Sequence, residues 1–329
     1  MFNVFLMRRA LALAVVATVS ASLCVAQEEK KESKIREFEL HYGATVTGVA
    51  AGNTARVWMP VPPTSEDQTV TVLSVPDASK TATESKYNNS ILYTDATAGA
   101  DGEIHLEAKY KIVRKEVTSD GNKIDIPKEE IELFLKPDRL VPLNGKPSKL
   151  LQGKTLPNDQ IELGKLFYNT VDDHMKYSKE GQGWGRGDSE WACDSKFGNC
   201  TDFHSVFISM ARSHQIPAKF EIGFSVPEKR GEGEIAGYHC WAKFKPNDKG
   251  WVPVDISEAN KNPKMRDYYF GNLTVDRVTF STGRDITLVP KQAGPDLNFF
   301  VYPYVEVDGK PVPNDKIKRK IRYKDVNGS

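Results

Sequence analysis

Residues 196–214 read KFGNCTDFHSVFISMARSH, and the rest of the chain is interpreted around this stretch. Asn199 is a favoured helix N-cap, and Asp202 adds negative charge to the first turn that follows it. Apolar residues then recur at spacings of three and four, which is typical of a mostly buried helix. The pattern therefore predicts a helix that begins at Cys200 and ends near Ser213.

The position of Cys200 suits a reactive thiol. A cysteine reacts as its thiolate, and an ordinary thiol with a pKa near ~8.5 is only a few per cent ionised at neutral pH. The helix dipole stabilises a negative charge at the N-terminus by roughly 0.3 to 2 kcal/mol, which does not suffice alone. A catalytic thiolate therefore needs an imidazolium beside it. The alternative interpretation is a buried, unreactive cysteine.

The first residues have the pattern of a secretory signal peptide. Two arginines precede an apolar run over residues 10–19, and a charged run begins directly after Ala26. We therefore expect residues 1–26 to be removed and the mature protein to be exported, either to the periplasm or into the medium. A lipoprotein modified at Cys24 is the weaker alternative.

Composition and charge exclude some classes of protein. The chain has 45 basic and 44 acidic residues that are mixed along its length, so we expect no nucleic-acid partner. No second apolar run is long enough to span a bilayer, so we expect the mature protein not to cross a membrane. The length allows two domains, and the sequence does not indicate an oligomeric state.

Three cysteines, Cys193, Cys200 and Cys240, follow the predicted signal peptide. An odd number in an exported protein leaves at least one thiol unpaired. A disulfide between Cys193 and Cys240 is one pairing that the spacing allows. A zinc site formed by these cysteines and His239 is a further alternative, although it lacks Cys-x-x-Cys pairs and the adjacent His239 and Cys240 point to opposite faces of a strand.

Short alternating segments bounded by turn residues predict an antiparallel β-sandwich over residues 34–126. The predicted strands are 35–41, 54–60, 68–75, 87–93 and 103–113. The second of them is stopped by Pro60 and has the pattern of an edge strand. The irregular, proline-rich residues 127–154 are interpreted as a linker, and residues 311–329 as a basic C-terminal tail.

A second domain is predicted over residues 155–310, with helices first and an antiparallel sheet after them. A helical pattern over residues 158–175 precedes the cysteine helix. Strand patterns follow that helix at residues 219–226, 238–244, 251–255, 277–281, 285–289 and 298–307. The glycine-rich residues 181–188 lie between the two helices and are expected to form a mobile loop at the border of the site.

Among six histidines, His239 is the best candidate partner for Cys200. His204 shares a helix face with Cys200, but its side chain points down the helix and away from the open end. His239 lies early in one predicted strand and Asp255 ends the next. If these strands pair through the turn at residues 245–250, Asp255 can orient the imidazole of His239.

Four segments, in this order and spacing, closely resemble the transglutaminase-like superfamily: GNCTDF at 198–203, IPAKF at 216–220, YHCWA at 238–242 and WVPVD at 251–255. The resemblance covers roughly residues 160–289. It implies that Cys200 is the nucleophile, His239 the general base and acid, and Asp255 the residue that orients His239. The implied fold is α+β and similar to papain-like cysteine proteases, with a cysteine-bearing helix packed on an antiparallel sheet.

The resemblance implies acyl transfer at a peptide or carboxamide bond through a thioester. Our leading interpretation is a hydrolytic peptidase or amidase acting on a protein or peptide substrate, for example cell-wall peptide. A protein cross-linking transglutaminase and a non-catalytic binding module are the alternatives. The calcium sites of animal cross-linking enzymes are not recognisable, and no cofactor or metal is expected.

The mechanism also needs hydrogen-bond donors for the oxyanion. The backbone amide of Cys200 is the expected first donor, because it lies at a helix N-terminus. Gln182, Trp184, Trp191 and Trp241 are the candidates for a second.

Overall fold

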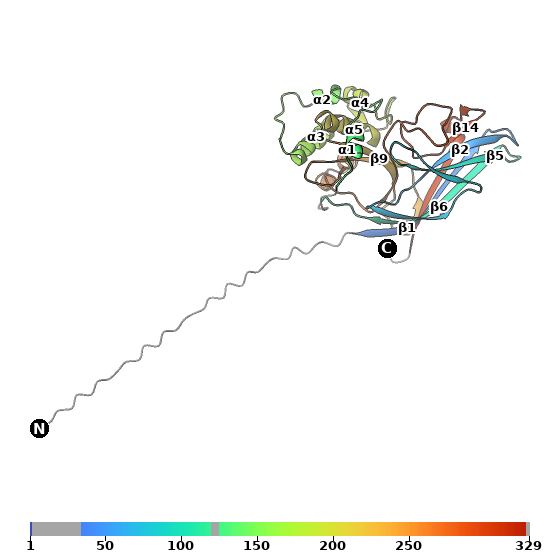
Figure 1. Ribbon diagram of the computed structural model, residues 1–329, viewed down its shortest axis with the longest axis horizontal. Coiled ribbons are helices and arrows are strands. Elements are labelled where there is room, and N and C mark those ends of the chain that lie inside the picture. Colours follow the sequence, from blue (N-terminus) through green and yellow to red (C-terminus); the bar gives the residue numbers. More distant parts are fainter. Residues whose placement is uncertain (2–33, 120–124, 327–329) are drawn as a thin grey trace. The chain divides into compact units, whose positions relative to one another are not determined.

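The computed structural model describes Met1, residues 34–119 and residues 125–326. All but the first residue of the predicted signal peptide, 1–26, therefore lies outside the described residues. In the unit Ser33–Ser329, two five-stranded sheets, a four-stranded sheet and a short two-stranded one are accompanied by helices, which gather beside the four-stranded sheet (Figure 1). Within the described ranges, no helix is long and apolar enough to cross a membrane.

The first five-stranded sheet is antiparallel and has the order β10-β16-β1-β6-β3. Its strands are β1 (Ile35–Thr47), β3 (Gln68–Ser74), β6 (Glu103–Lys115), β10 (Glu232–Glu234) and β16 (Ile317–Asp325). Buried and more exposed residues alternate along β1 and β6, because one face of this sheet lies on the core. The strands predicted near residues 35, 68 and 103 are thus confirmed.

The second five-stranded sheet has the order β15-β14-β2-β5-β4. Its strands are β2 (Thr54–Val61), β4 (Lys80–Thr83), β5 (Ser90–Thr97), β14 (Tyr304–Val307) and β15 (Lys310–Pro311). The prediction of an edge strand at residues 54–60 is wrong, because β2 lies in the middle of the sheet. Its proline is tolerated since β14 pairs only with residues 55–58 and ends before Pro60.

The strand predicted from Tyr87 begins only at Ser90. The backbone amides of Tyr87 and Asn89 donate to the carboxylate of Glu84 instead of to a neighbouring strand. Asn88 between them has a left-handed backbone with φ of 62°. These residues therefore form the turn that leads from β4 into β5.

The C-terminal residues supply strands to both five-stranded sheets. The predicted boundary at residue 310, after which only a tail was expected, is therefore corrected. β16 pairs with β1 from Val46 to Phe38, although residues 311–329 were interpreted as a tail. Its Ile317, Ile321 and Tyr323 are buried, whereas the basic residues between them are mostly exposed. The basic segment is therefore a half-buried strand whose charged face is in water.

The four-stranded sheet has the order β12-β11-β9-β13. Its strands are β9 (Ala218–Ser225), β11 (Tyr238–Phe244), β12 (Val252–Val254) and β13 (Arg277–Thr282). The two predicted helices are α3 (Gln160–His174) and α5 (Cys200–Ser213), and α5 packs against α3, β9 and β11. This is the predicted arrangement of a cysteine-bearing helix on an antiparallel sheet.

Shorter elements connect these parts. They are α1 (Lys128–Leu133), α2 (Lys146–Lys149), β7 (Lys176–Tyr177), α4 (Ser189–Ser195), β8 (Phe197–Gly198), α6 (Ile256–Lys261) and two 3-10 turns, Pro263–Met265 and Asn314–Lys316. Residues 127–154 thus contain two short helices and are less irregular than predicted.

Two further strand predictions fail in part. Residues 285–289 form only an isolated bridge between Ile286 and Leu297, because the amide of Leu288 donates to the side chain of Gln292. The strand predicted over residues 298–307 is reduced to β14.

A test of the C-terminal strand compares Ile321→Ala with Lys320→Ala. Ile321 is buried on the core face of β16 and Lys320 is exposed on the other face. We expect Ile321→Ala to lower the free energy of unfolding by about 2 to 5 kcal/mol, since it leaves a cavity. Lys320→Ala should change it by no more than ~0.5 kcal/mol. Urea unfolding measures both, and equal small effects would contradict the placement of β16.

Candidate active site

The first turn of α5 presents Cys200 at a capped helix end. Asn199 Oδ1 accepts from the amide of Thr201 at 3.0 Å, and Asp202 Oδ2 accepts from the amide of Asn199 at 2.9 Å. Together these bonds form a capping box. Cys200 is the first helical residue, so its own amide has no acceptor within the helix. Its side chain is almost completely buried, with the residue 3% exposed.

His239 and Asp255 meet across two paired strands. β11 and β12 pair antiparallel, and Asp255 directly follows β12. His239 Nε2 donates to Asp255 Oδ2 at 2.7 Å, and both residues are buried. The other ring nitrogen, Nδ1, is left for the hydrogen bond that joins the side chains of His239 and Cys200. The structure thus brings Cys200, His239 and Asp255 together in one hydrogen-bonded row.

The carboxylate of Asp255 is surrounded by donors. Arg277 Nη1 donates to Oδ2 at 3.0 Å, while Ser257 Oγ and the amide of Glu258 donate to Oδ1, each at 3.1 Å. The last of these bonds makes Asp255 the N-cap of α6. Burial would raise the pKa of Asp255, but His239 and Arg277 outweigh it and hold the pKa well below its usual range.

Opposite shifts in pKa favour an ion pair between Cys200 and His239. Burial would raise the pKa of the Cys200 thiol, but hydrogen bonds with Cys240 and His239 and the charge of His239 lower it well below its ordinary value. Burial would lower the pKa of His239, but the charge and hydrogen bond of Asp255 and the bond with Cys200 raise it to about 10. These shifts favour the thiolate of Cys200 together with the imidazolium of His239.

Comparisons with known proteins identify a related sequence family and a similar fold. The pattern of the transglutaminase-like superfamily matches residues 149–256, which include α5, β11 and Asp255. We refer to residues 149–256, by this match, as the transglutaminase-like domain. An uncharacterized protein of Haemophilus influenzae is 32% identical over 198 residues, which are 50% of this chain and 53% of that protein. The chain thus spans about half the length of this relative.

A crystal structure described as that of a "Putative Cysteine Protease" from Cytophaga hutchinsonii is similar over most of the chain. The TM-score is 0.57 at 13% sequence identity, and the match covers 90% of this chain and 93% of that one. At this identity the likeness shows the fold alone. It extends well beyond the transglutaminase-like domain, so the two five-stranded sheets belong to the shared architecture.

Two buried residues of the transglutaminase-like domain have contacts that the sequence analysis missed. Cys240 was expected to point away from His239, yet its thiol also hydrogen-bonds to Cys200. Burial and the charge of Cys200 raise the pKa of Cys240 well above its ordinary value, so it stays a protonated donor. His204 Nε2 accepts from the amide of Ile256 at 3.1 Å, and its Nδ1 lies 3.7 Å from Cys240 Sγ. The sequence did contain a signal for the contact of Cys240. Side chains alternate between the two faces of a strand, and this alternation turns Cys240 towards α5.

The structure does not support the disulfide or the zinc site. Cys193, Cys200 and Cys240 are all free thiols, so a bridge between Cys193 and Cys240 is absent. Among residues 34–119 and 125–326, two groups of three or more donor side chains lie close enough to share an ion, and neither contains a cysteine.

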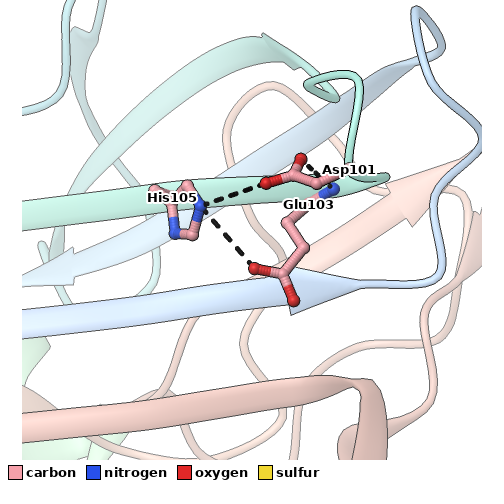
Figure 2. A group of neighbouring side chains, drawn as sticks. All are labelled: Asp101, Glu103 and His105. Carbon is pink, nitrogen blue, oxygen red and sulfur yellow. Dashed lines mark hydrogen bonds and ion pairs between the residues drawn. The ribbon is translucent and has the colours of Figure 1, made fainter.

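One of these groups, His239, Asp255 and Glu258, belongs to the site itself. The side chains of this group already form ion pairs with one another, and its carboxylates also pair with Arg277 and Lys261. Figure 2 shows the other, at the connection from β5 to β6 and the start of β6, where His105 Nε2 lies 4.0 Å from Asp101 and 3.6 Å from Glu103. These side chains are largely in water, and we assign them no function.

Asp202 ties the glycine-rich loop to the cysteine helix. Its carboxylate accepts from the amides of Gly185 at 2.7 Å and Gly187 at 2.9 Å, besides that of Asn199. Gly187 has a φ of 60°, and a Cβ there would lie 2.7 Å from Ser205 Oγ. Burial raises the pKa of Asp202 to about 6 although these amides favour its charged form. The loop that was expected to be mobile is thus anchored at two amides, and Asp202 does more than complement the helix dipole.

The structure reduces the set of candidates for the second oxyanion donor. Trp241 is fully buried and its indole N–H donates to Glu221 Oε2 at 2.7 Å, so it is not available. Trp191 packs edge-on against Phe197, with ring centroids 5.4 Å apart. Gln182 is exposed and Trp184 is half-buried in the glycine-rich loop.

Replacing Asp202 by asparagine should loosen this loop. An amide side chain offers one acceptor oxygen and turns donors towards the remaining backbone amides, and hydrogen bonds to charged groups contribute about 1.5 to 3 kcal/mol each. We expect hydrogen exchange at Gly185 or Gly187 to accelerate at least roughly tenfold at neutral pH. Asp194→Asn, an exposed acid on the neighbouring α4, is the matched control. Unchanged exchange in Asp202→Asn would contradict the anchor.

Proposed function

We propose that this protein is an exported cysteine-dependent enzyme that transfers acyl groups from peptide or carboxamide bonds, with Cys200, His239 and Asp255 as its catalytic triad. The observation that carries the proposal is the buried row in which Asp255 binds His239 at 2.7 Å and His239 binds Cys200. The transglutaminase-like pattern over residues 149–256 supports it, as does the fold shared with a protein described as a cysteine protease.

In the acylation step, the Cys200 thiolate attacks the carbonyl carbon of the substrate. A sulfur–carbon bond forms, and the carbonyl electron pair moves onto the oxygen, which the Cys200 amide stabilises. When the carbonyl reforms, the carbon–nitrogen bond breaks and the His239 imidazolium gives its proton to the departing amine. The products of this step are a thioester on Cys200 and a neutral His239.

In the deacylation step, neutral His239 takes a proton from water as the oxygen of that water attacks the thioester. The carbon–sulfur bond breaks, the carboxylic acid leaves, and the thiolate–imidazolium pair is restored. An amine in place of water gives a new amide, which is the cross-linking alternative. We propose water as the main acceptor and protein or peptide chains, such as cell-wall peptide, as substrates.

Asp255 has an orienting role in this mechanism. Its hydrogen bond to Nε2 fixes which ring nitrogen of His239 faces the sulfur, and its charge stabilises the imidazolium. Arg277 in turn holds the carboxylate in its charged form. Asp255 therefore acts through His239 and does not touch the substrate.

The rate of Cys200 alkylation by iodoacetamide as a function of pH tests the pair. The pKa of Cys200 is lowered, so the thiolate is present above that lowered value and the rate should level off at a lower pH than it does for an ordinary thiol. In His239→Ala the main cationic partner is lost, and the rate should rise through the ordinary thiol range near ~8.5. Mass spectrometry of the Cys200 peptide measures both.

Cys193 supplies an internal control in the same experiment. Burial raises the pKa of its thiol to about 12, so its alkylation should be slow and should still rise with pH above 8. An ordinary thiol profile for Cys200 in the wild type would refute the activated pair and favour a non-catalytic binding module.

A second experiment separates hydrolysis from cross-linking. Glutamine-containing peptides are incubated with the enzyme, with and without an excess of a primary amine, and the products are identified by mass spectrometry. We expect the carboxylic acid or cleaved peptide to dominate in both cases, and Cys200→Ala to form neither product. Dominant amide formation with the amine would instead establish the cross-linking activity.

A further inference from the structure

Tyr238 brings a phenol hydroxyl to the N-terminal end of the cysteine helix. Asn199 Nδ2 donates to this hydroxyl oxygen at 2.8 Å. The orientation of the Asn199 amide is fixed, because its Oδ1 accepts from both the backbone amide and the hydroxyl of Thr201. The phenol oxygen is therefore an acceptor for Asn199, and its own proton remains available for donation. The side chain of Thr201 is its second hydrogen-bonding neighbour at rest.

The ring of Tyr238 is held on several sides. Its backbone amide donates to the hydroxyl of Tyr302 at 3.0 Å. The ring packs against Phe299 and Tyr302, with centroid distances of 5.5 and 6.0 Å. These contacts fix the ring, so the position of the hydroxyl oxygen is preorganised.

The charge of Cys200 acts on this hydroxyl, although the hydroxyl is not among the hydrogen-bond donors that lower the pKa of Cys200. After burial, the negative charge of Cys200 is the largest cause that raises the pKa of Tyr238, which keeps its hydroxyl protonated. The hydrogen bonds that lower the pKa of Cys200 come from Cys240 and His239. The phenol of Tyr238 thus lies within the electrostatic influence of Cys200, while the hydrogen bonds to the sulfur come from other side chains.

The glycine-rich loop approaches this hydroxyl closely. Gly185 has a φ of 83°, and a Cβ at this position would lie 3.2 Å from Asn199 Nδ2 and 3.7 Å from the Tyr238 hydroxyl. The amide of Gly185 is fixed in turn by Asp202. The absence of a side chain at Gly185 therefore lets the loop backbone pack closely against the Asn199–Tyr238 pair.

We propose that the Tyr238 hydroxyl is the second oxyanion donor, acting with the backbone amide of Cys200. The inference rests on the proposed function, since it concerns the acylation step at the same site. When the sulfur–carbon bond forms, the carbonyl electron pair moves to the oxygen, which accepts hydrogen bonds from both groups. No proton is transferred to it, and the pair returns to the carbonyl when the leaving group departs. Asn199 is a positioning residue that directs the Tyr238 proton.

Two reactions of Cys200 separate this role from activation of the thiol. Acylation by p-nitrophenyl acetate forms a sulfur–carbon bond at a carbonyl, generates an oxyanion and releases p-nitrophenolate. Alkylation by iodoacetamide displaces iodide at a saturated carbon and generates no oxyanion. Both need the thiolate, but only the first needs the proposed donor.

Tyr238→Phe is the test variant, because it removes the hydroxyl and keeps the ring. We expect its rate of acylation to fall on the order of 10²-fold, as for loss of one oxyanion-hole donor. Its alkylation rate and pH profile should match the wild type within about twofold, since thiolate formation is unchanged and the site is folded. Tyr93→Phe, which removes a hydroxyl on β5 in the second five-stranded sheet, is the matched control and should leave both rates unchanged.

Two results would overturn the inference while leaving the triad intact. Wild-type acylation in Tyr238→Phe would show that the hydroxyl does not stabilise the oxyanion. A parallel fall in acylation and alkylation would show that the hydroxyl supports the resting thiolate instead. An ordinary thiol profile without acylation in the wild type would refute the proposed function itself, and the inference with it.

Discussion

The hydrogen bond between His239 and Asp255 is the interaction on which the rest of the site depends. Removing a carboxylate from water costs several kcal/mol, and a buried charge is tolerated only when donors surround it. Asp255 meets this condition through His239, Arg277, Ser257 and the first turn of α6. One carboxylate thereby joins β11, β12, β13 and α6, so the geometry of the triad and the stability of the domain rest on the same contacts.

The sheets outside the transglutaminase-like domain support this arrangement through β13 and β11. Gln68 of β3 binds both the amide and the carbonyl of Thr279, two residues after Arg277. Lys243 of β11 pairs with Asp67, which directly precedes β3. Arg36 of β1 binds Asp276, just before β13, and Asp325 at the end of β16. The N-terminal and C-terminal strands therefore hold the two strands that carry His239 and Arg277.

The sequence predicts the parts of the site that depend on local pattern. Cys200 follows an N-cap, His239 lies on β11, and Asp255 directly follows the neighbouring β12, so a few residues place each of them. Long-range pairing is not encoded in such patterns. The contact between Arg36 and Asp325 joins residues 289 positions apart. The alternating pattern of β16 predicts a strand, but it does not predict that this strand pairs with β1. Tyr238 was missed for a related reason, because an aromatic residue in a strand is usually a packing residue.

The capping chemistry of α5 also explains why the Cys200 amide is available. The amides of Asn199 and Thr201 have side-chain acceptors in the capping box, and those of Asp202 and Phe203 bond to the Asn199 carbonyl. The amide of Cys200 lies between them at the first helical position and has no acceptor in the helix. The same cap directs Asn199 towards Tyr238 and Asp202 towards the glycine-rich loop. This first turn thus stabilises the helix, includes one amide donor at Cys200 that has no acceptor in the helix, and fixes the loop and the tyrosine around it.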